Sequence, residues 1–346
     1  MLFRNFTIKS FLAASWSSAA PKLRIWSGQP ELIKVFATPH DPRSLTERGS
    51  LHFMGKLRYM VLAGPTAVGK TDLAIRIAQE LQTEIVGGDA FQIYRGLDIL
   101  TGKPTFSQLA AVRHHLVGIL ALTELCDAHK YTLLARQTIA ALNQGGITPL
   151  VVGGTGFYLQ ALEDGFPQVP PADLALRAEL NRLSTAELLG DLETRDTVAS
   201  NRIDRHNRRR IIRALEVCLL SGRPFSSFLE ETTSDPPIAR IVLERPRTVL
   251  IQKINQRVDE MFERGVVAEV VSVEAIGSTA SRAIGFQLIR SLLAGTIDIS
   301  SCKDAIKQQT RNYAKRQMTW FRRPPYELVP ADASVDFLIA AFRRRF

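Results

Sequence analysis

This sequence has few cysteines and no long apolar run. Its 346 residues include only three cysteines, Cys126, Cys218 and Cys302, which lie far apart and form no Cys-x-x-Cys pair. This spacing excludes a disulfide framework and a cysteine-based zinc site, and it fits a reducing compartment. No apolar stretch approaches the roughly 20 residues that a membrane-spanning helix needs. We therefore expect a cytoplasmic protein that makes no contact with a membrane.

The first 20 residues contain no acidic side chain. They carry Arg4, Lys9 and four serines, a composition compatible with an organelle transit peptide, and the protein would then be organellar. The alternative, which we favour slightly, is an N-terminal extension that precedes a true start at Met54 or Met60. Residues 1–56 are set apart from the fold prediction in either case.

Positive charge gathers at the two ends of the chain. The formal net charge is +10, of which residues 1–56 contribute +5 and residues 303–346 contribute +6. The residues between them are close to neutral. Basic ends indicate a polyanionic partner such as a nucleic acid, although basic tails that contact only solvent would give the same pattern.

Short apolar runs alternate with helical periodicity in the first half of the chain. Strands are expected at residues 59–63, 84–86 and 149–152, and amphipathic helices follow Thr71 and span residues 131–142. This alternation predicts an α/β fold around a parallel sheet. After Gly165 the strand signals fade. We expect an α/β core of residues 57–164 and 223–325 with C-terminal helices, a helical insertion of residues 165–222, and a tail of residues 326–346.

A P-loop follows the first expected strand. Residues 64–71 read Gly-Pro-Thr-Ala-Val-Gly-Lys-Thr and match G-x-x-x-x-G-K-[ST], with a strand before them and a helix after them. Glycines let the backbone wrap a phosphate chain, and amides at the helix start point at the anion. Lys70 supplies a charge and the Thr71 hydroxyl suits Mg²⁺. The motif predicts a di- or triphosphate ligand, without specifying ATP, bound by Gly64, Pro65, Thr66, Ala67, Val68, Gly69, Lys70 and Thr71.

Two further segments follow expected strands at the same edge of the sheet. Asp89 comes directly after the second strand, where a carboxylate can act as a general base or hold Mg²⁺ through water, or simply cap a turn. Gln92 follows on the same segment. Residues 153–156, Gly-Gly-Thr-Gly, come after the third strand and either form a second polar wall with Thr155 or only a tight turn.

Basic residues cluster on two expected helices. Arg205, Arg208, Arg209, Arg210 and Arg213 crowd the start of one, a density that contact with a phosphate backbone would explain. Lys307, Arg311 and Lys315 recur every four residues on the other. Gln317, Trp320 and Phe321 nearby can stack on or hydrogen-bond with an unstacked nucleotide, or can make an ordinary core contact. His114 and His115 have no partner at metal-ligand spacing, so no metal site is assigned to them.

Taken together, these segments resemble the tRNA dimethylallyltransferases, also called tRNA isopentenyltransferases. The resemblance covers residues 59–323 and rests on seven motifs in order: GPTAVGKT (64–71), GGDAFQIYRGLDI (87–99), HHLVGI (114–119), PLVVGGTGFYL (149–159), RRRIIRALEV (208–217), AIGF (283–286) and TRNYAKRQMTWFR (310–322). One such motif would be weak evidence, whereas seven in register are specific.

The resemblance implies a reaction. A dimethylallyl group passes from dimethylallyl diphosphate to N6 of the adenosine 3′ of the anticodon in tRNA, and diphosphate leaves. Asp89 would be the base on N6, while Lys70, Arg257 and a Mg²⁺ ion on Thr71 would stabilise the charge on the diphosphate. The target base would be flipped out of its stack. The insertion would bind tRNA, and the family's tRNA-contact positions fall here on Asp89, Ala90, Phe91, Gln92, Thr155, Arg177, Arg209, Arg210, Ile211, Ile212 and Arg213.

The chain departs from the family pattern at three places. Ala90 replaces the usual serine, residues 100–103 read Leu-Thr-Gly-Lys in place of Gly-Thr-Ala-Lys, and Lys253 stands where arginine is common. Two other functions share parts of the pattern: prenylation of free adenine nucleotides, and phosphoryl transfer by a small-molecule kinase. A monomer is expected.

Overall fold

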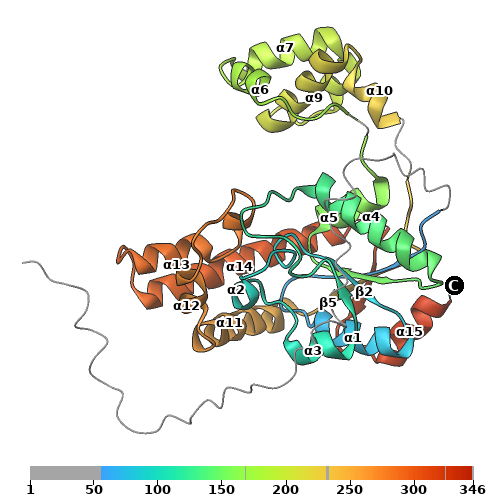
Figure 1. The fold of residues 1–346 in the computed structure, drawn as a ribbon, viewed down its shortest axis with the longest axis vertical. Helices are drawn as coiled ribbons and strands as arrows, with labels where there is room; N and C mark the ends of the chain where they lie inside the picture. The colour runs from blue at the N-terminus through green and yellow to red at the C-terminus, as the bar shows by residue number, and fades with distance from the viewer. Residues whose placement is uncertain (1–55, 168, 231–233, 324, 345–346) are drawn as a thin grey trace, which may run out of the picture. The chain divides into compact units, whose positions relative to one another are not determined.

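The computed structural model describes residues 56–346, apart from residues 168, 231–233, 324, 345 and 346. The predictions made for residues 1–55 lie outside the described residues. A six-stranded sheet in the order β3-β2-β4-β1-β5-β6 forms the centre, and all its pairs are parallel (Figure 1). The strands are β1 (Met60–Ala63), β2 (Ile85–Gly88), β3 (His114–His115), β4 (Leu150–Gly153), β5 (Ala239–Glu244) and β6 (Glu327–Pro330). The predicted α/β fold with a parallel sheet is therefore confirmed.

Side chains of β1 alternate between two hydrophobic clusters, one on each face of the sheet. Val61 and Ala63 pack against α4 (Ala128–Gln144) and α5 (Gly156–Asp164). Met60 and Leu62 pack on the opposite side against α1 (Lys70–Glu80) and α15 (Val335–Arg343). Both faces of a parallel sheet are buried in this arrangement, which explains why the strand is apolar at every position.

The register of the sheet brings three loops to one edge. Met60 of β1 pairs with Leu150 of β4 and with Ala239 of β5. Parallel strands end at the same side, so the segments that follow β1, β2 and β4 meet there. The other core helices are α2 (Asp98–Thr101), α3 (Phe106–Ala111), α11 (Arg247–Glu263), α12 (Val266–Val271), α13 (Phe286–Leu293) and α14 (Ile299–Phe321), with a 3₁₀ turn at Ala280–Arg282. None of the described helices combines the length and the apolar character needed to cross a membrane.

The segment after Gly165 consists of helices with a hydrophobic cluster of their own, around Leu188, Leu192 and Leu215. These helices are α6 (Leu174–Leu180), α7 (Thr185–Arg195), α8 (Thr197–Arg202), α9 (Arg208–Ser221) and α10 (Phe225–Glu230). The predicted boundary at residue 222 comes one helix too early. Ser226 of α10 donates from its amide and its hydroxyl to the buried Asp196 carboxylate, at 2.7 and 2.8 Å, and so belongs with the insertion.

The prediction that residues 326–346 form a tail is wrong. Strand β6 extends the sheet by pairing with β5, so that Leu328 lies opposite Val242. Helix α15 then returns onto α1 and buries Leu338 and Phe342 completely. Four residues that follow two prolines give little sequence signal for a strand. Residues 327–330 become a strand through their pairing with β5.

Candidate active site

The P-loop after β1 is shaped by residues in the left-handed region of backbone space. Gly64, Ala67 and Gly69 have φ angles of 149°, 62° and 103°. A Cβ at Gly64 would lie 2.8 Å from the carbonyl oxygen of Leu243, so only glycine fits there. Gly69 caps α1 without a side-chain hydrogen bond, so amides of the first turn are available to a ligand. The loop therefore presents N–H groups to an anion, as the motif predicts.

Lys70 folds back over this loop. Its Nζ donates to the carbonyl oxygens of Gly64 at 2.9 Å and Pro65 at 2.7 Å. Burial lowers the pKa of Lys70 to about 8, although the nearby Asp89 carboxylate opposes the shift. The amine is therefore mostly protonated at neutral pH, and a bound anion would stabilise its charged form further.

This pKa predicts a pH dependence for anion binding. Lys70 is protonated below about pH 8 and loses its charge above it, so the affinity for inorganic diphosphate should fall as pH rises through about 8. Titration calorimetry between about pH 7 and about pH 9 measures this fall. Lys70→Arg keeps its charge throughout the range and controls for protonation of diphosphate itself. Equal pH profiles for the two proteins would contradict the assignment.

Asp89 is held by the backbone that follows it. Its Oδ1 accepts hydrogen bonds from the amides of Phe91 at 2.9 Å and Gln92 at 3.2 Å. Among the described residues, none donates a hydrogen bond to Oδ2. One oxygen therefore orients the carboxylate, and the other is available to accept a proton from a ligand in the cavity.

Arg257 reaches the same site from α11. Its Nη1 donates to the Thr66 hydroxyl at 2.8 Å and its Nη2 donates to the Thr101 carbonyl at 3.1 Å. Burial lowers the pKa of Arg257, and the Asp89 carboxylate opposes this shift. The two hydrogen bonds hold the guanidinium between the P-loop and residues 100–103, where it could bind a phosphate group.

Residues 100–103, where the chain departs from the family pattern, pack against Arg257. Gly102 closes α2 with a φ angle of 60°, and a Cβ there would overlap the Arg257 guanidinium. Leu100, in place of the usual glycine, is buried in the cluster that includes Val258 and Ile306. Alanine at position 102 and Arg257 in its observed place are therefore incompatible.

Gly102→Ala should accordingly displace Arg257. We expect kcat to fall by about 10- to 100-fold, an order of magnitude typical of a misplaced charge-stabilising group. Gly222→Ala is the matched control, because Gly222 closes α9 with a φ angle of 67° but has no atom near its Cβ position. Backbone strain alone would lower the melting temperature of both variants. Equal kcat values for the two variants would show that Gly102 is not needed to leave room for the Arg257 guanidinium.

Gln317 joins the two glycine turns. Its Oε1 accepts from the Thr66 amide at 2.9 Å, and its Nε2 donates to the Gly154 carbonyl at 2.8 Å. The side chain is only 5% exposed, so of the two roles that the sequence left open, a nucleotide contact or a core contact, the structure favours the core contact. Beside it, the Thr155 hydroxyl accepts from the Ala90 amide at 3.2 Å. The Gly-Gly-Thr turn thus forms a wall next to Asp89, a role that its sequence left open.

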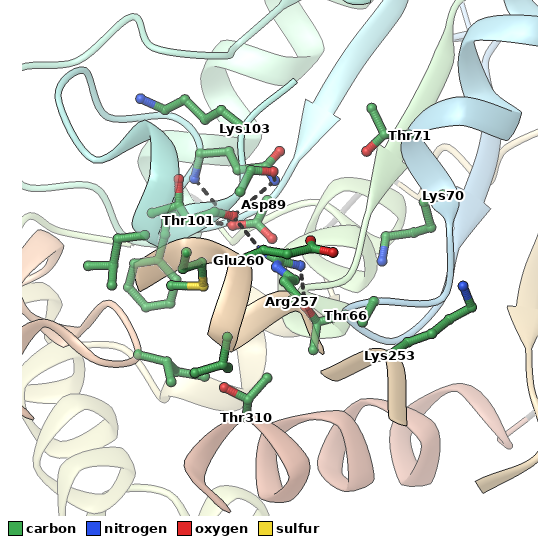
Figure 2. A pocket seen from close by; sticks show the side chains of 18 of the residues that line it. Thr66, Lys70, Thr71, Asp89, Thr101, Lys103, Lys253, Arg257, Glu260 and Thr310 are labelled. Atoms are coloured by element: carbon green, nitrogen blue, oxygen red, sulfur yellow. Dashed lines mark hydrogen bonds between the residues drawn. The ribbon is translucent and has the colours of Figure 1, made fainter. Parts of the chain in front are cut away.

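These segments enclose a cavity of about 480 Å³. Lys70, Asp89 and Arg257 point into it from α1, the end of β2 and α11 (Figure 2). Apolar side chains line another part of it, among them Leu100, Val258, Met261, Ala283 and Ile306. Lys253 adds a positive charge to its lining, whereas Lys103 also lines it but forms an ion pair with Asp98. The cavity can therefore take a short anion with a small apolar group attached.

The polar wall of the cavity contains oxygen donors beside its cations. Thr71 and Asp89 both line the cavity, and Mg²⁺ prefers such hard oxygen donors. The described residues contain no group of three histidine, cysteine or carboxylate side chains that would hold a metal alone. Thr71 and Asp89 could therefore hold a Mg²⁺ ion only together with further oxygen ligands, such as those of a bound phosphate group.

Some arginines of the insertion form hydrogen bonds within it, and others are exposed. Arg177 and Arg213 both donate to the fully buried Glu216 carboxylate, and Arg208 donates to backbone carbonyls such as that of Asn181 at 3.0 Å. These three arginines hold the insertion together. The side chains of Ile211 and Ile212 are buried in its core.

Arg209 and Arg210 are exposed. In the part of the chain that the structure describes, neither side chain has a hydrogen bond or ion pair. They are therefore available to contact an RNA backbone, and contact by any of the insertion positions stays a prediction. The spacing of the arginines in the sequence does not show which of them are held in ion pairs and which are exposed. Their acidic partner Glu216 lies one helical turn after Arg213.

Comparison with known proteins places the chain in a family. A family model for IPP transferase matches residues 92–324, and one for isopentenyl transferase matches residues 57–125. The chain belongs to the tRNA dimethylallyltransferase family. It is 41% identical over 281 residues to tRNA dimethylallyltransferase 1 of Trichlorobacter lovleyi, an alignment that covers 78% of this chain and 92% of that protein. With tRNA dimethylallyltransferase of Bifidobacterium longum, it is 40% identical over 278 residues, which are 78% and 84% of the two chains.

Solved structures of tRNA dimethylallyltransferases agree with the fold. The full-length tRNA isopentenylpyrophosphate transferase of Bacillus halodurans aligns with a TM-score of 0.62 and 31% identity, over 84% of this chain and 98% of that one. A eukaryotic dimethylallyltransferase acting on tRNA aligns with a TM-score of 0.71 at 24% identity, over 84% and 77% of the two chains, which supports the fold alone.

Proposed function

We propose that this protein transfers a dimethylallyl group from dimethylallyl diphosphate to N6 of the adenosine 3′ of the anticodon in tRNA. The observation that carries the proposal is the cavity between the P-loop and Asp89. A phosphate-binding loop with two cations, an apolar wall and a carboxylate with one unpaired oxygen lie around one space. Family membership supports the same activity.

The P-loop and its cations would hold the leaving group. As the bond between C1 and oxygen breaks, negative charge grows on the diphosphate. Lys70 and Arg257 both line the cavity and would stabilise this charge, Lys70 by exchanging its hydrogen bonds to the P-loop carbonyls for bonds to the diphosphate. The apolar wall would hold the five-carbon group and exclude water from C1.

Asp89 would accept the proton from the acceptor. The N6 amine is a weak nucleophile because its lone pair is delocalised into the adenine ring. As nitrogen bonds to C1, its N–H proton passes to Oδ2 of Asp89, and the neutral product amine remains. A Mg²⁺ ion bound by Thr71 and the diphosphate oxygens would supply further neutralisation of the leaving group.

The insertion would bind the anticodon arm through Arg209 and Arg210. Each phosphate contact releases condensed counterions, so tRNA affinity should fall steeply as salt rises. We expect Arg209→Ala with Arg210→Ala to reduce the slope of log affinity against log salt by roughly one to two, with kcat unchanged. Filter binding at several salt concentrations measures the slope. Arg247→Ala, at an exposed arginine of α11 outside the insertion, is the control and should leave the slope unchanged. An unaltered slope in the double variant would refute the contact.

Donor and acceptor identity test the proposal against its two alternatives. Radiolabelled dimethylallyl diphosphate and ATP are each offered with an anticodon stem-loop or with AMP. The proposal predicts transfer only from dimethylallyl diphosphate to the stem-loop. Transfer to AMP alone would indicate a nucleotide prenyltransferase, and phosphoryl transfer from ATP would indicate a kinase. We also propose that the protein is a cytoplasmic monomer. Size-exclusion chromatography with light scattering tests the oligomeric state.

A further inference from the structure

Two aromatic side chains meet beside the Gly-Gly-Thr turn. The rings of Phe157 and Trp320 lie edge to face, with their centroids 6.4 Å apart and a 78° angle between their planes. Phe157 is 49% exposed although it lies in the first turn of α5. A Cβ on Gly156 would lie 2.6 Å from Cγ of Trp320, so the indole rests directly on this backbone. The indole is therefore packed against this backbone, and the Phe157 ring lies beside it at the surface.

Trp320 belongs to a stripe on α14 in which aromatic and basic residues alternate. Tyr313, Arg316 and Trp320 are spaced three and four residues apart and so share one face of α14, and Arg323 follows two residues after the helix ends. The Arg316 guanidinium lies over the Tyr313 ring at 5.7 Å from its centroid. Arg316 and Arg323 are exposed, and residues 313–323 contain no acidic side chain.

Two of the three residues in the basic stripe predicted on this helix, Lys307 and Arg311, already have partners in the structure. Lys307 forms an ion pair with Asp259 at 2.8 Å, and Arg311 donates to the Asn255 side chain at 2.8 Å. The cations of α14 that remain available lie further along, beside the aromatic residues. The exposed arginines that can bind a phosphate group therefore lie beside the aromatic rings that can stack on a base.

This stripe begins at the reaction site. Tyr313 lines the cavity together with Gln317, whose Nε2 donates to the carbonyl oxygen of Gly154, the residue before Thr155. Thr155 in turn binds the amide of Ala90, the residue after Asp89, and precedes Phe157 by two positions. A chain of contacts therefore leads from Asp89 outward through Thr155 to the aromatic pair.

We propose that Phe157 and Trp320 form a stacking platform for the nucleotide next to the target adenosine, whose phosphate is bound by Arg316 and Arg323. The proposal rests on the tRNA acceptor proposed above. A base flipped into the cavity leaves its neighbour in the loop without a stacking partner. Aromatic rings beside arginines are the surface that binds such an unstacked nucleotide.

The test uses anticodon stem-loops with 2-aminopurine at the position 5′ or 3′ of the target adenosine. Stacking on the platform should quench 2-aminopurine fluorescence at one of the two positions when wild-type protein binds. Phe157→Leu should weaken this quenching and raise KM for the stem-loop about tenfold, with KM for dimethylallyl diphosphate unchanged. Phe337→Leu is the matched control, since Phe337 is 45% exposed on α15.

The outcomes separate this proposal from the function on which it rests. If wild-type protein transfers no group to the stem-loop, the proposed function fails. If it does, and Phe157→Leu keeps both the quenching and the KM of wild type, the platform is refuted. A rise in both KM values, or a loss of activity with a lowered melting temperature, would show a structural role and would also overturn the platform. Trp320→Phe, which keeps a ring, should retain most of the quenching.

Discussion

Replacing Asp89 by asparagine should reduce kcat for transfer to tRNA by about 10²- to 10⁴-fold, the usual contribution of a positioned general base. Asparagine keeps an oxygen that can accept from the amides of Phe91 and Gln92, so the turn after β2 should retain its shape. It cannot take up a proton. The variant therefore separates the proton acceptor from the structural part of the same side chain. Single-turnover kinetics with excess enzyme measures the loss directly.

Two controls accompany this variant. Affinity for the anticodon stem-loop should stay within about threefold of wild type, because one neutralised carboxylate removes no phosphate contact. Asp72→Asn, at an exposed carboxylate that also borders the cavity, should keep most of the activity. A kcat of Asp89→Asn within about threefold of wild type would refute the role of Asp89 as the base.

Replacing Arg257 by methionine should reduce kcat by about 10²- to 10³-fold, as removal of a preorganised charge at a leaving group does. Arg257→Lys should recover only a small part, since an ammonium group cannot donate along both directions that the guanidinium uses toward Thr66 and Thr101. Measured kcat and KM for both substrates distinguish leaving-group stabilisation, which lowers kcat, from donor binding, which raises KM.

Arg247→Lys is the control for this pair of variants. Arg247 is exposed at the start of the same helix and does not border the cavity, so the change should leave kcat unaltered. Circular dichroism melting curves should show that all three variants remain folded. Equal kcat values for Arg257→Lys and wild type would show that charge alone, without the two fixed contacts, suffices.

The donor half of the site was predictable because its signals are local. The P-loop needs a strand, a glycine-containing turn and a helix start in immediate succession, and residues 60–80 provide all three. Asp89 was placed correctly at the sheet edge for the same reason, since it directly follows β2. In both cases the backbone at the end of a strand determines where the side chain lies.

Other features depend on contacts between distant parts of the chain. Strand β5 was missed because Arg240 and Glu244 interrupt its apolar pattern, yet Arg240 is compensated by the buried Glu163 carboxylate at 2.9 Å. Gln317 bridges to Thr66 across 251 positions, and Gly102 is required by an arginine on another helix. No window of sequence contains such pairs, so these roles follow only from the fold.

The most direct test of the proposed function is mass spectrometry of tRNA nucleosides. Unmodified tRNA is incubated with the full-length protein, dimethylallyl diphosphate and Mg²⁺, then digested and analysed. The proposal predicts one added five-carbon unit on N6 of the adenosine 3′ of the anticodon, with one diphosphate released per modified nucleoside. Unmodified tRNA after complete incubation, alongside prenylated AMP or consumption of ATP in parallel reactions, would contradict it.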